Sequence, residues 1–229
     1  MTQKKKKTII VILSIVITLS VAISAYLIIK GNIEETGIAQ MEENILDYVI
    51  ESPIIEPTEE PDNPDDFTND ADWAFDWDKL LRTNSDVIGW IRFDNPDRIN
   101  YPIVQRAGSN QYYLNRDWTG AYRSSGAIFL HKDNAPNFTD MNSIIYGHRM
   151  NRGSMFGGLT KYQSQSFMNN NPYFYIYTPD GQKRTYEAFV FAEVQDGSDV
   201  YSSSFPSKED KLSYFDMMYD KAILPTVFI

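Results

Sequence analysis

The side chains best suited to proton transfer in this chain are its two histidines, His131 and His148. An imidazole has an ordinary pKa of about 6.5, so it can donate or accept a proton near neutral pH. The 229 residues contain no cysteine, which excludes disulfides, cysteine-ligated zinc and a thiol nucleophile within them. A lone histidine is often a surface or hydrogen-bonded structural residue, so the surrounding sequence has to decide between the two interpretations.

His148 ends a segment, residues 143–148, that is predicted to be a β-strand. The end of a strand lies at the rim of a sheet, where loops build sites, and Gly147 permits a close approach or unusual backbone angles. A metal site made of His131, Asp133 and His148 is the alternative. The sequence has neither an EF-hand loop nor a His-Glu-x-x-His spacing, so we expect no metal, no cofactor and a solvated loop start at His131.

Short β-rich segments dominate the second half of the chain. They cover residues 87–93, 99–105, 126–131, 143–148, 173–178 and 184–194. The last two segments flank Pro179-Asp180-Gly181, which is typical of a hairpin turn. Several short strands at this spacing predict a barrel or a sandwich.

Three helices are expected around these strands. The first is indicated by an apolar stripe at i, i+4, i+7 and i+8, made of Trp73, Trp77, Leu80 and Leu81. Ser109 is expected to cap a short helix that carries residues 112–114. Ser207, followed by Asp210, resembles a capping box in front of a helix that runs towards residue 223.

The N-terminus has the pattern of a membrane anchor. Residues 1–7 form a tail with a basic cluster at 4–7, and residues 8–29 carry no charge. At about 1.5 Å per residue such a helix spans the roughly 30 Å hydrocarbon core. A cleaved signal peptide is the alternative, but its apolar region is shorter, about 7 to 15 residues. The basic cluster places the N-terminus in the cytoplasm and the rest of the chain outside.

Residues 30–72 are expected to form an acidic, proline-rich stalk. Residues 31–72 contain no Lys or Arg, and the repelling charges and stiff prolines favour an extended conformation, with a short helix near 41–50. The formal net charge of −10 argues against a nucleic acid as partner, because phosphate binding needs clustered basic residues.

The segment around His148 resembles a known family. NSIIYGHRMNRGSMF, residues 142–156, is similar to the histidine segment of class B sortases. The segments DVIGWIRF, INYPIVQ, NQYYLNRDW and GAIFLH also occur in the family's order. The resemblance covers residues 73–229 and lies behind an N-terminal anchor, as in that family.

The resemblance implies a mainly β fold, a closed β-barrel with an N-terminal helix and a late inserted helix, preceded by a transmembrane helix. Class B sortases are cysteine transpeptidases at the cell membrane. They cleave a C-terminal sorting signal of secreted proteins, form a thioester and pass the acyl group to an amine of a peptidoglycan precursor. The implied partners are therefore a sorting-signal peptide, that amine and the membrane.

Specific residues match the family's site. His148 matches the histidine that protonates the leaving amine and later deprotonates the attacking one. Asn110, Leu114 and Tyr146 match positions that contact the peptide. Ordinary core packing remains the alternative for Leu114 and Tyr146.

The sequence departs from the family's pattern near its end. The family's cysteine follows a strand after the late helix and its arginine lies on the next strand, but here residues 227–229 only begin a strand. Neither Arg149 nor Arg152 follows such a strand. We therefore expect a truncated, inactive chain whose exposed strand edge favours aggregation. The alternatives are a non-catalytic, membrane-tethered surface protein that binds a peptide or wall component, and a structural domain without a binding groove.

Overall fold

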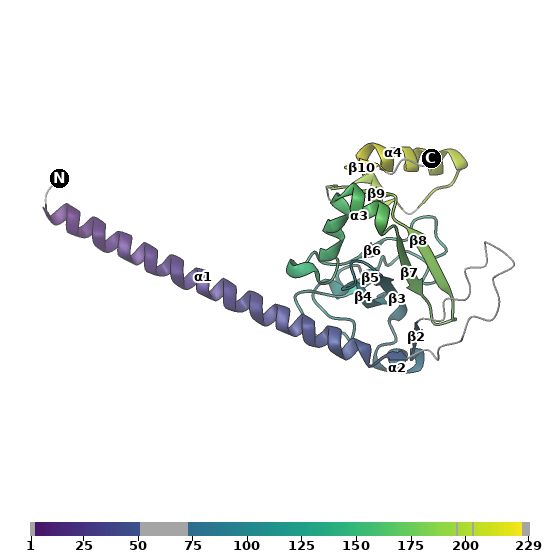
Figure 1. Cartoon of the computed structure of the whole chain (residues 1–229), viewed down its shortest axis with the longest axis horizontal. Helices are drawn as coiled ribbons and strands as arrows, with labels where there is room; N and C mark the ends of the chain where they lie inside the picture. Colours follow the sequence, from purple (N-terminus) through teal and green to yellow (C-terminus); the bar gives the residue numbers. More distant parts are fainter. Residues whose placement is uncertain (1–2, 51–72, 196, 203, 226–229) are drawn as a thin grey trace. The chain divides into compact units, whose positions relative to one another are not determined.

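The computed structural model describes residues 3–50, 73–195, 197–202 and 204–225 (Figure 1). The chain divides into two compact units, Met1–Asn44 and Ile45–Ile229, and each is considered by itself.

Helix α1, Gln3–Leu46, includes residues 8–29, which were expected to form a membrane anchor. Among the described residues it is the one helix long and apolar enough to cross a membrane. The hydroxyls of Thr18 and Ser20 donate to the carbonyls of Ser14 and Val16, each at 2.9 Å. These polar groups are satisfied within the helix, as a hydrocarbon environment requires.

Residues 31–46 continue α1, so the extended conformation expected for residues 31–40 is wrong, whereas the short helix expected near 41–50 is confirmed as far as Leu46. The segment has no proline before Pro53 and includes good helix formers such as Ala39, Met41 and Glu42. These propensities outweigh the repulsion between its acidic side chains. Residues 51–72, the rest of the expected stalk, lie outside the described residues.

A six-stranded sheet forms the centre of the second unit, in the order β6-β5-β4-β3-β7-β8. Neighbours are antiparallel except β4 and β5, which are parallel. The strands are β3 (Val87–Phe93), β4 (Asn100–Val104), β5 (Ile128–Leu130), β6 (Ile145–Tyr146), β7 (Tyr173–Tyr177) and β8 (Lys183–Glu187). The six segments predicted as strands between residues 87 and 194 are confirmed, although β6 is short and the last segment is divided between β8 and β9. The strand expected to begin at residues 227–229 lies outside the described residues.

Strand β3 lies in the middle of the sheet and is buried on both faces. On one face the Phe93 ring stacks on Phe174 with a centroid distance of 4.8 Å. On the other face Trp90 packs against Phe75 at 4.6 Å, and its indole N–H donates to the Asn100 side chain at 2.6 Å. The sheet curls into a half-barrel, and β6 and β8 are its edges within the described residues.

The remaining elements are short. They are β1 (Val49–Ile50), β2 (Ala74–Phe75), η1 (Tyr112–Leu114), η2 (Asn151–Gly153), η3 (Gly157–Gln163), α3 (Gln165–Asn170), β9 (Val190–Phe191), η4 (Asp199–Tyr201) and β10 (Leu224–Pro225). β1 pairs with β2, and β9 pairs with β10. The predicted hairpin turn between β7 and β8 is confirmed, with Gly181 in the left-handed conformation at φ 81°.

Helix α2, Trp77–Thr83, begins later than predicted. Asp76 is its N-cap and accepts the backbone N–H of Lys79 at 2.9 Å. Trp73 therefore lies outside the helix, where its ring packs on the guanidinium of Arg92 at 4.5 Å. The apolar spacing was correct for the later residues, but it did not reveal that a cap separates Trp73 from them.

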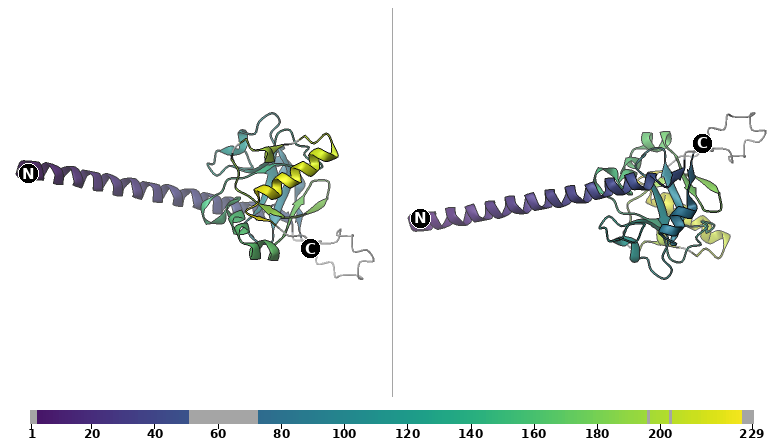
Figure 2. Two further views of the ribbon diagram at one scale, coloured as in Figure 1. Left: turned by 90° about the horizontal axis from the view of Figure 1, so that it is seen from above. Right: turned by 90° about the horizontal axis from the view of Figure 1, so that it is seen from below.

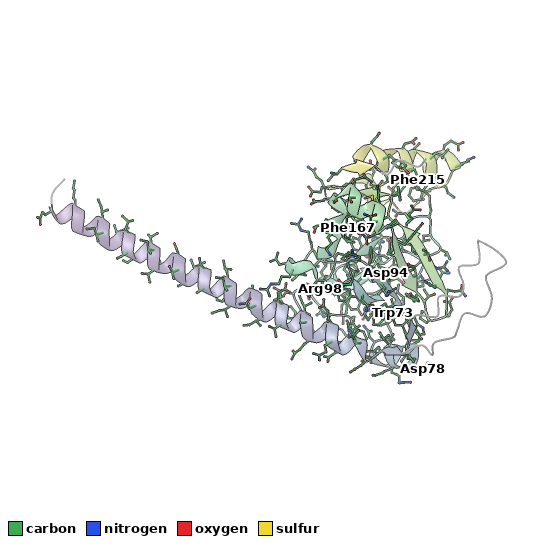
Figure 3. All side chains as sticks on the ribbon, in the orientation of Figure 1. Trp73, Asp78, Asp94, Arg98, Phe167 and Phe215 are labelled. Atoms are coloured by element: carbon green, nitrogen blue, oxygen red, sulfur yellow. The ribbon has the colours of Figure 1, made fainter. Side chains whose placement is uncertain are left out.

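Helix α4, Lys208–Lys221, begins with the predicted capping box. The Ser207 hydroxyl accepts the N–H of Asp210 at 3.0 Å, and the Asp210 carboxylate accepts the N–H of Ser207 at 2.9 Å. The two views of Figure 2 show α4 and α2 on opposite sides of the second unit. The side chains labelled Asp78 on α2 and Phe215 on α4 mark these two ends in Figure 3.

Candidate active site at the end of strand β6

His148 lies just past β6, at one end of the β5–β6 pair. The antiparallel register pairs Phe129 with Tyr146 and Leu130 with Ile145. Continued by two residues, this register sets His148 beside Ala127. The His148 side chain is partly exposed, and among the described residues we find no hydrogen bond to its imidazole. The ring is therefore accessible for proton transfer.

Gly147 is required because the chain passes very close to its neighbours. A Cβ at this position would lie 2.5 Å from Ile128 Cδ1 and 2.6 Å from the ring of Phe156. No side chain fits into that space without moving them. The close approach expected for Gly147 is thus present, and it brings His148 against the start of β5.

The chain that carries Asn110 and Leu114 runs alongside β5. The Asn110 side-chain oxygen accepts the N–H of Lys132 at 2.7 Å, beyond one end of β5. The Tyr113 carbonyl accepts the N–H of Ala127 at 3.0 Å, at the other end. Leu114 is 41% exposed, so it is a surface residue and not part of the core. It lies at the same end of β5 as His148.

Gly126 makes this contact between η1 and β5 possible. Its φ of 62° belongs to the left-handed region. A Cβ there would also lie 2.6 Å from the Tyr113 carbonyl oxygen and 2.7 Å from that of Leu114. Glycine therefore lets the chain turn into β5 beneath η1.

Tyr146 pairs with β5 between the end near Asn110 and the end near Leu114, and aromatic rings surround it. Its ring stacks on Phe129 with a centroid distance of 5.0 Å, and His131 and Tyr201 lie 6.1 Å and 6.5 Å away. Burial, with a smaller contribution from Tyr201, raises the pKa of the Tyr146 phenol above its ordinary value. The side chain is only partly buried, so it is not a pure core residue.

Tyr201 is a neighbour of the site that sequence reasoning missed. It belongs to η4, and Asn142 holds this turn by donating to the carbonyls of Val200 at 3.1 Å and Ser202 at 2.8 Å. The Tyr214 hydroxyl of α4 donates to the same Val200 carbonyl at 2.9 Å. The contact joins residues far apart in sequence, and nothing in the local pattern could have indicated it.

His131 does not join His148 in a cluster of metal ligands. Its Nδ1 accepts the backbone N–H of Asp133 at 3.3 Å. Asp133 in turn forms an ion pair with Lys132, whose hydrogen bond lowers the pKa of the carboxyl group. In the parts of the chain that the structure describes, no three His, Cys, Asp or Glu side chains are grouped to hold a metal ion.

A largely apolar cavity of about 560 Å³ borders the other face of β6. Its walls come from β3, β7, β8, β9, η3 and α4, and include Ile91, Phe93, Ile145, Phe156, Phe191 and Met218. The site thus combines a partly exposed imidazole with aromatic and apolar surface. No thiol can complete it from within this chain, because the sequence has no cysteine.

Comparison with known proteins identifies this arrangement. The family model of the sortase domain matches residues 94–213. Sortase B of Listeria monocytogenes is 32% identical over 146 residues, which cover 63% of this chain and 57% of that protein. The chain thus spans less than three fifths of this relative's length.

Solved structures agree in fold. Sortase B from Bacillus anthracis in complex with AAEK1 has a TM-score of 0.65 at 27% identity, and the match covers 88% of this chain and 86% of that one. The Staphylococcus aureus sortase B–substrate complex has a TM-score of 0.62 at 26% identity and covers 67% and 70%.

The half-barrel and the matched domain define a sortase fold, and the chain belongs to the sortase family. Its relatives and structural neighbours are sortase B proteins, so it is a member of class B. The family resemblance and the expected mainly β, sortase-like fold with an N-terminal helix and a late helix are confirmed, and in the described residues the sheet is curled into a half-barrel.

Proposed function

We propose that this chain supplies the acid-base and peptide-binding part of a class B sortase transpeptidase. The observation that carries the proposal is His148 at the end of β6, within a matched sortase domain, two residues after Tyr146 and at the same end of β5 as Leu114. In this reaction a thiolate attacks the carbonyl of a sorting signal, and the His148 imidazolium protonates the departing amine. The resulting thioester is then attacked by a peptidoglycan-precursor amine, whose proton His148 accepts as the thiolate leaves.

The peptide in this proposal lies along β5 and contacts Asn110, Leu114 and Tyr146. Their placement supports the assignment, since Asn110 lies beyond one end of β5, Leu114 lies near the other, and Tyr146 pairs with the strand between them. A strand-like peptide rises about 3.3 Å per residue, so a segment of a few residues is long enough to run along β5 from Asn110 to Leu114.

The same proposal gives each region of the chain a place at the membrane. Residues 1–7 are a cytoplasmic tail, residues 8–29 cross the membrane once, residues 30–72 are a stalk, and residues 73–229 form the sortase domain on the outer face. The uninterrupted apolar part of α1 supports the anchor, and the basic cluster supports the orientation.

The 229-residue chain by itself is expected to be inactive. Without a thiol it cannot form the thioester, and acid-base catalysis alone supplies only about 10²- to 10⁴-fold of rate enhancement. The absence of cysteine also favours a second candidate function, in which a membrane-tethered protein binds a peptide or wall component without cleaving it.

A chimera tests the catalytic proposal. The chain is extended by the C-terminal segment of the Listeria monocytogenes sortase B that carries its cysteine and arginine. Peptides from C-terminal sorting signals of the same organism's secreted proteins serve as substrates. We expect cleavage by the chimera, none by the 229-residue chain, and a loss of about 10²- to 10⁴-fold on His148→Ala. His131→Ala is the control. Cleavage that survives His148→Ala would show that this imidazole has no catalytic role.

Peptide binding tests the groove independently of catalysis. Tyr146→Ala should weaken binding of the same peptides to the 229-residue chain, because it removes a ring that stacks between Phe129 and Tyr201. Tyr122→Ala is the matched control, since Tyr122 is 76% exposed. Equal affinities of both variants and the unchanged chain would contradict a peptide groove at Tyr146.

A further inference from the structure

The loop that follows His148 contains a residue in an unfavourable backbone conformation, which neighbouring contacts have to stabilise. Arg149 and Met155 form an antiparallel bridge across it. Met155 has a φ of 49°, although its side chain is only 1% exposed. The left-handed region is rare for a residue with a long side chain, so this conformation persists only where neighbouring contacts stabilise it.

Tyr101 of β4 provides such a contact. Its ring is 2% exposed, and its hydroxyl accepts the backbone N–H of Met155 at 3.0 Å in a buried hydrogen bond. The next residue, Phe156, donates its backbone N–H to the carbonyl of His148 at 3.0 Å. Two successive amide groups therefore connect Tyr101, inside the sheet, with the backbone of His148.

The Phe156 ring makes a second connection to the same point. Its ring carbons lie 2.6 to 2.8 Å from the position that a Cβ of Gly147 would take. Phe156 therefore cannot shift towards this backbone without moving Gly147 and His148. No hydrogen bond to the His148 imidazole is found in the described part of the chain, so the backbone, which fixes the direction of the Cα–Cβ bond, limits the positions open to the ring.

We propose that Tyr101 is a positioning residue for His148. Its hydroxyl fixes Met155 in the left-handed conformation, Phe156 then holds the His148 carbonyl, and the imidazole keeps one direction relative to β5. This inference rests on the proposed acid-base role of His148. Tyr101 itself is buried beneath the site and touches no reacting atom.

The test follows the two histidines by NMR in the full chain, folded in detergent micelles with ¹³C-labelled histidine. Tyr101→Phe keeps the ring and removes only the hydroxyl. We expect the imidazole signal of His148 to shift and broaden while that of His131 stays unchanged. The Phe156 amide should exchange about fivefold faster, the change that corresponds to a lost hydrogen bond of about 1 kcal/mol.

Tyr113→Phe is the matched control. The Tyr113 side chain is also 2% exposed, and its hydroxyl donates to Asp86 and accepts from the Asn84 side chain, each at 2.8 Å. The variant therefore loses part-buried hydrogen bonds elsewhere in the unit. Its His148 signal should stay that of the unchanged chain. An unaltered His148 signal in Tyr101→Phe, or the same change in both variants, would overturn the proposal.

Two further results keep the inference testable. If Tyr101→Phe does not fold, amide exchange in the unchanged chain tests the proposal instead. If the Tyr101 hydroxyl holds Met155, the Met155 amide must be protected from exchange at least as well as the Phe156 amide. Rapid exchange at Met155 would rule out the hydrogen bond. The NMR signals do not depend on turnover, so a chimera that fails to cleave peptides would refute the transpeptidase proposal without affecting this measurement.

Discussion

Gly147→Ala changes the closest packing at the site by a single methyl group. The added Cβ would lie 2.5 Å from Ile128 Cδ1 and 2.6 Å from the Phe156 ring, and Ile128 is itself 1% exposed. Overpacking of a core typically costs about 1–3 kcal/mol. For a domain of about 150–250 residues, 2 kcal/mol lowers Tm by roughly 4–8 °C.

Thermal unfolding of the full chain in micelles measures this effect. Gly31→Ala is the control, since a Cβ there meets nothing within 4 Å and the unfolding of the second unit should not change. Ile128→Val alone costs about 0.5–1.5 kcal/mol. In the double variant, Gly147→Ala with Ile128→Val, the loss of stability should be smaller than the sum of the two single losses, because the obstructing Cδ1 is absent. A Tm of Gly147→Ala equal to that of the unchanged chain would refute the packing argument.

Two further predictions concern stability. Burial raises the pKa of Tyr162 and of Tyr177 to about 12 each; the unfolded value is about 10, so stability present below pH ~10 is lost as the pH rises towards about 12. The urea midpoint should fall over this range and fall less in Tyr177→Phe, and a pH-independent midpoint would contradict the assignment. Ser207→Ala removes the capping hydroxyl of α4 and should cost about 1 kcal/mol. Faster amide exchange in the first turn of α4 would report this loss, whereas unchanged exchange would mean that the cap contributes nothing.

The elements that the sequence predicted best are those whose signals are local. The uncharged run in α1, the short β-rich segments and the capping box of Ser207 are patterns of residues close together in the sequence. Predictions from local signals were wrong where two signals in the same segment favoured different structures. Acidic repulsion and proline suggested an extended stalk, but helix propensity prevails as far as Leu46. Asp76 separates Trp73 from the helix that its spacing indicated.

Candidate site residues could be named from the sequence only where the family motif supplies them, and their roles stay predictions. His148, Asn110, Leu114 and Tyr146 come from two short segments with recognisable patterns. Tyr201 reaches Tyr146 only because Asn142 and Tyr214 hold its turn, and such contacts between distant segments leave no periodicity in the sequence. The buried hydroxyl of Tyr101 is of the same kind.

The single parallel pair in the sheet has a consequence for where a ligand can bind. Antiparallel neighbours can be joined by a tight hairpin, whereas β4 and β5 require the chain to return over the outside of the sheet before it re-enters in the same direction. Residues 105–127 make this crossover, and Asn110 and Leu114 lie on it. The topology therefore obliges the fold to build a ridge beside β5, and a recognition surface can evolve on that ridge without any change to the strands beneath.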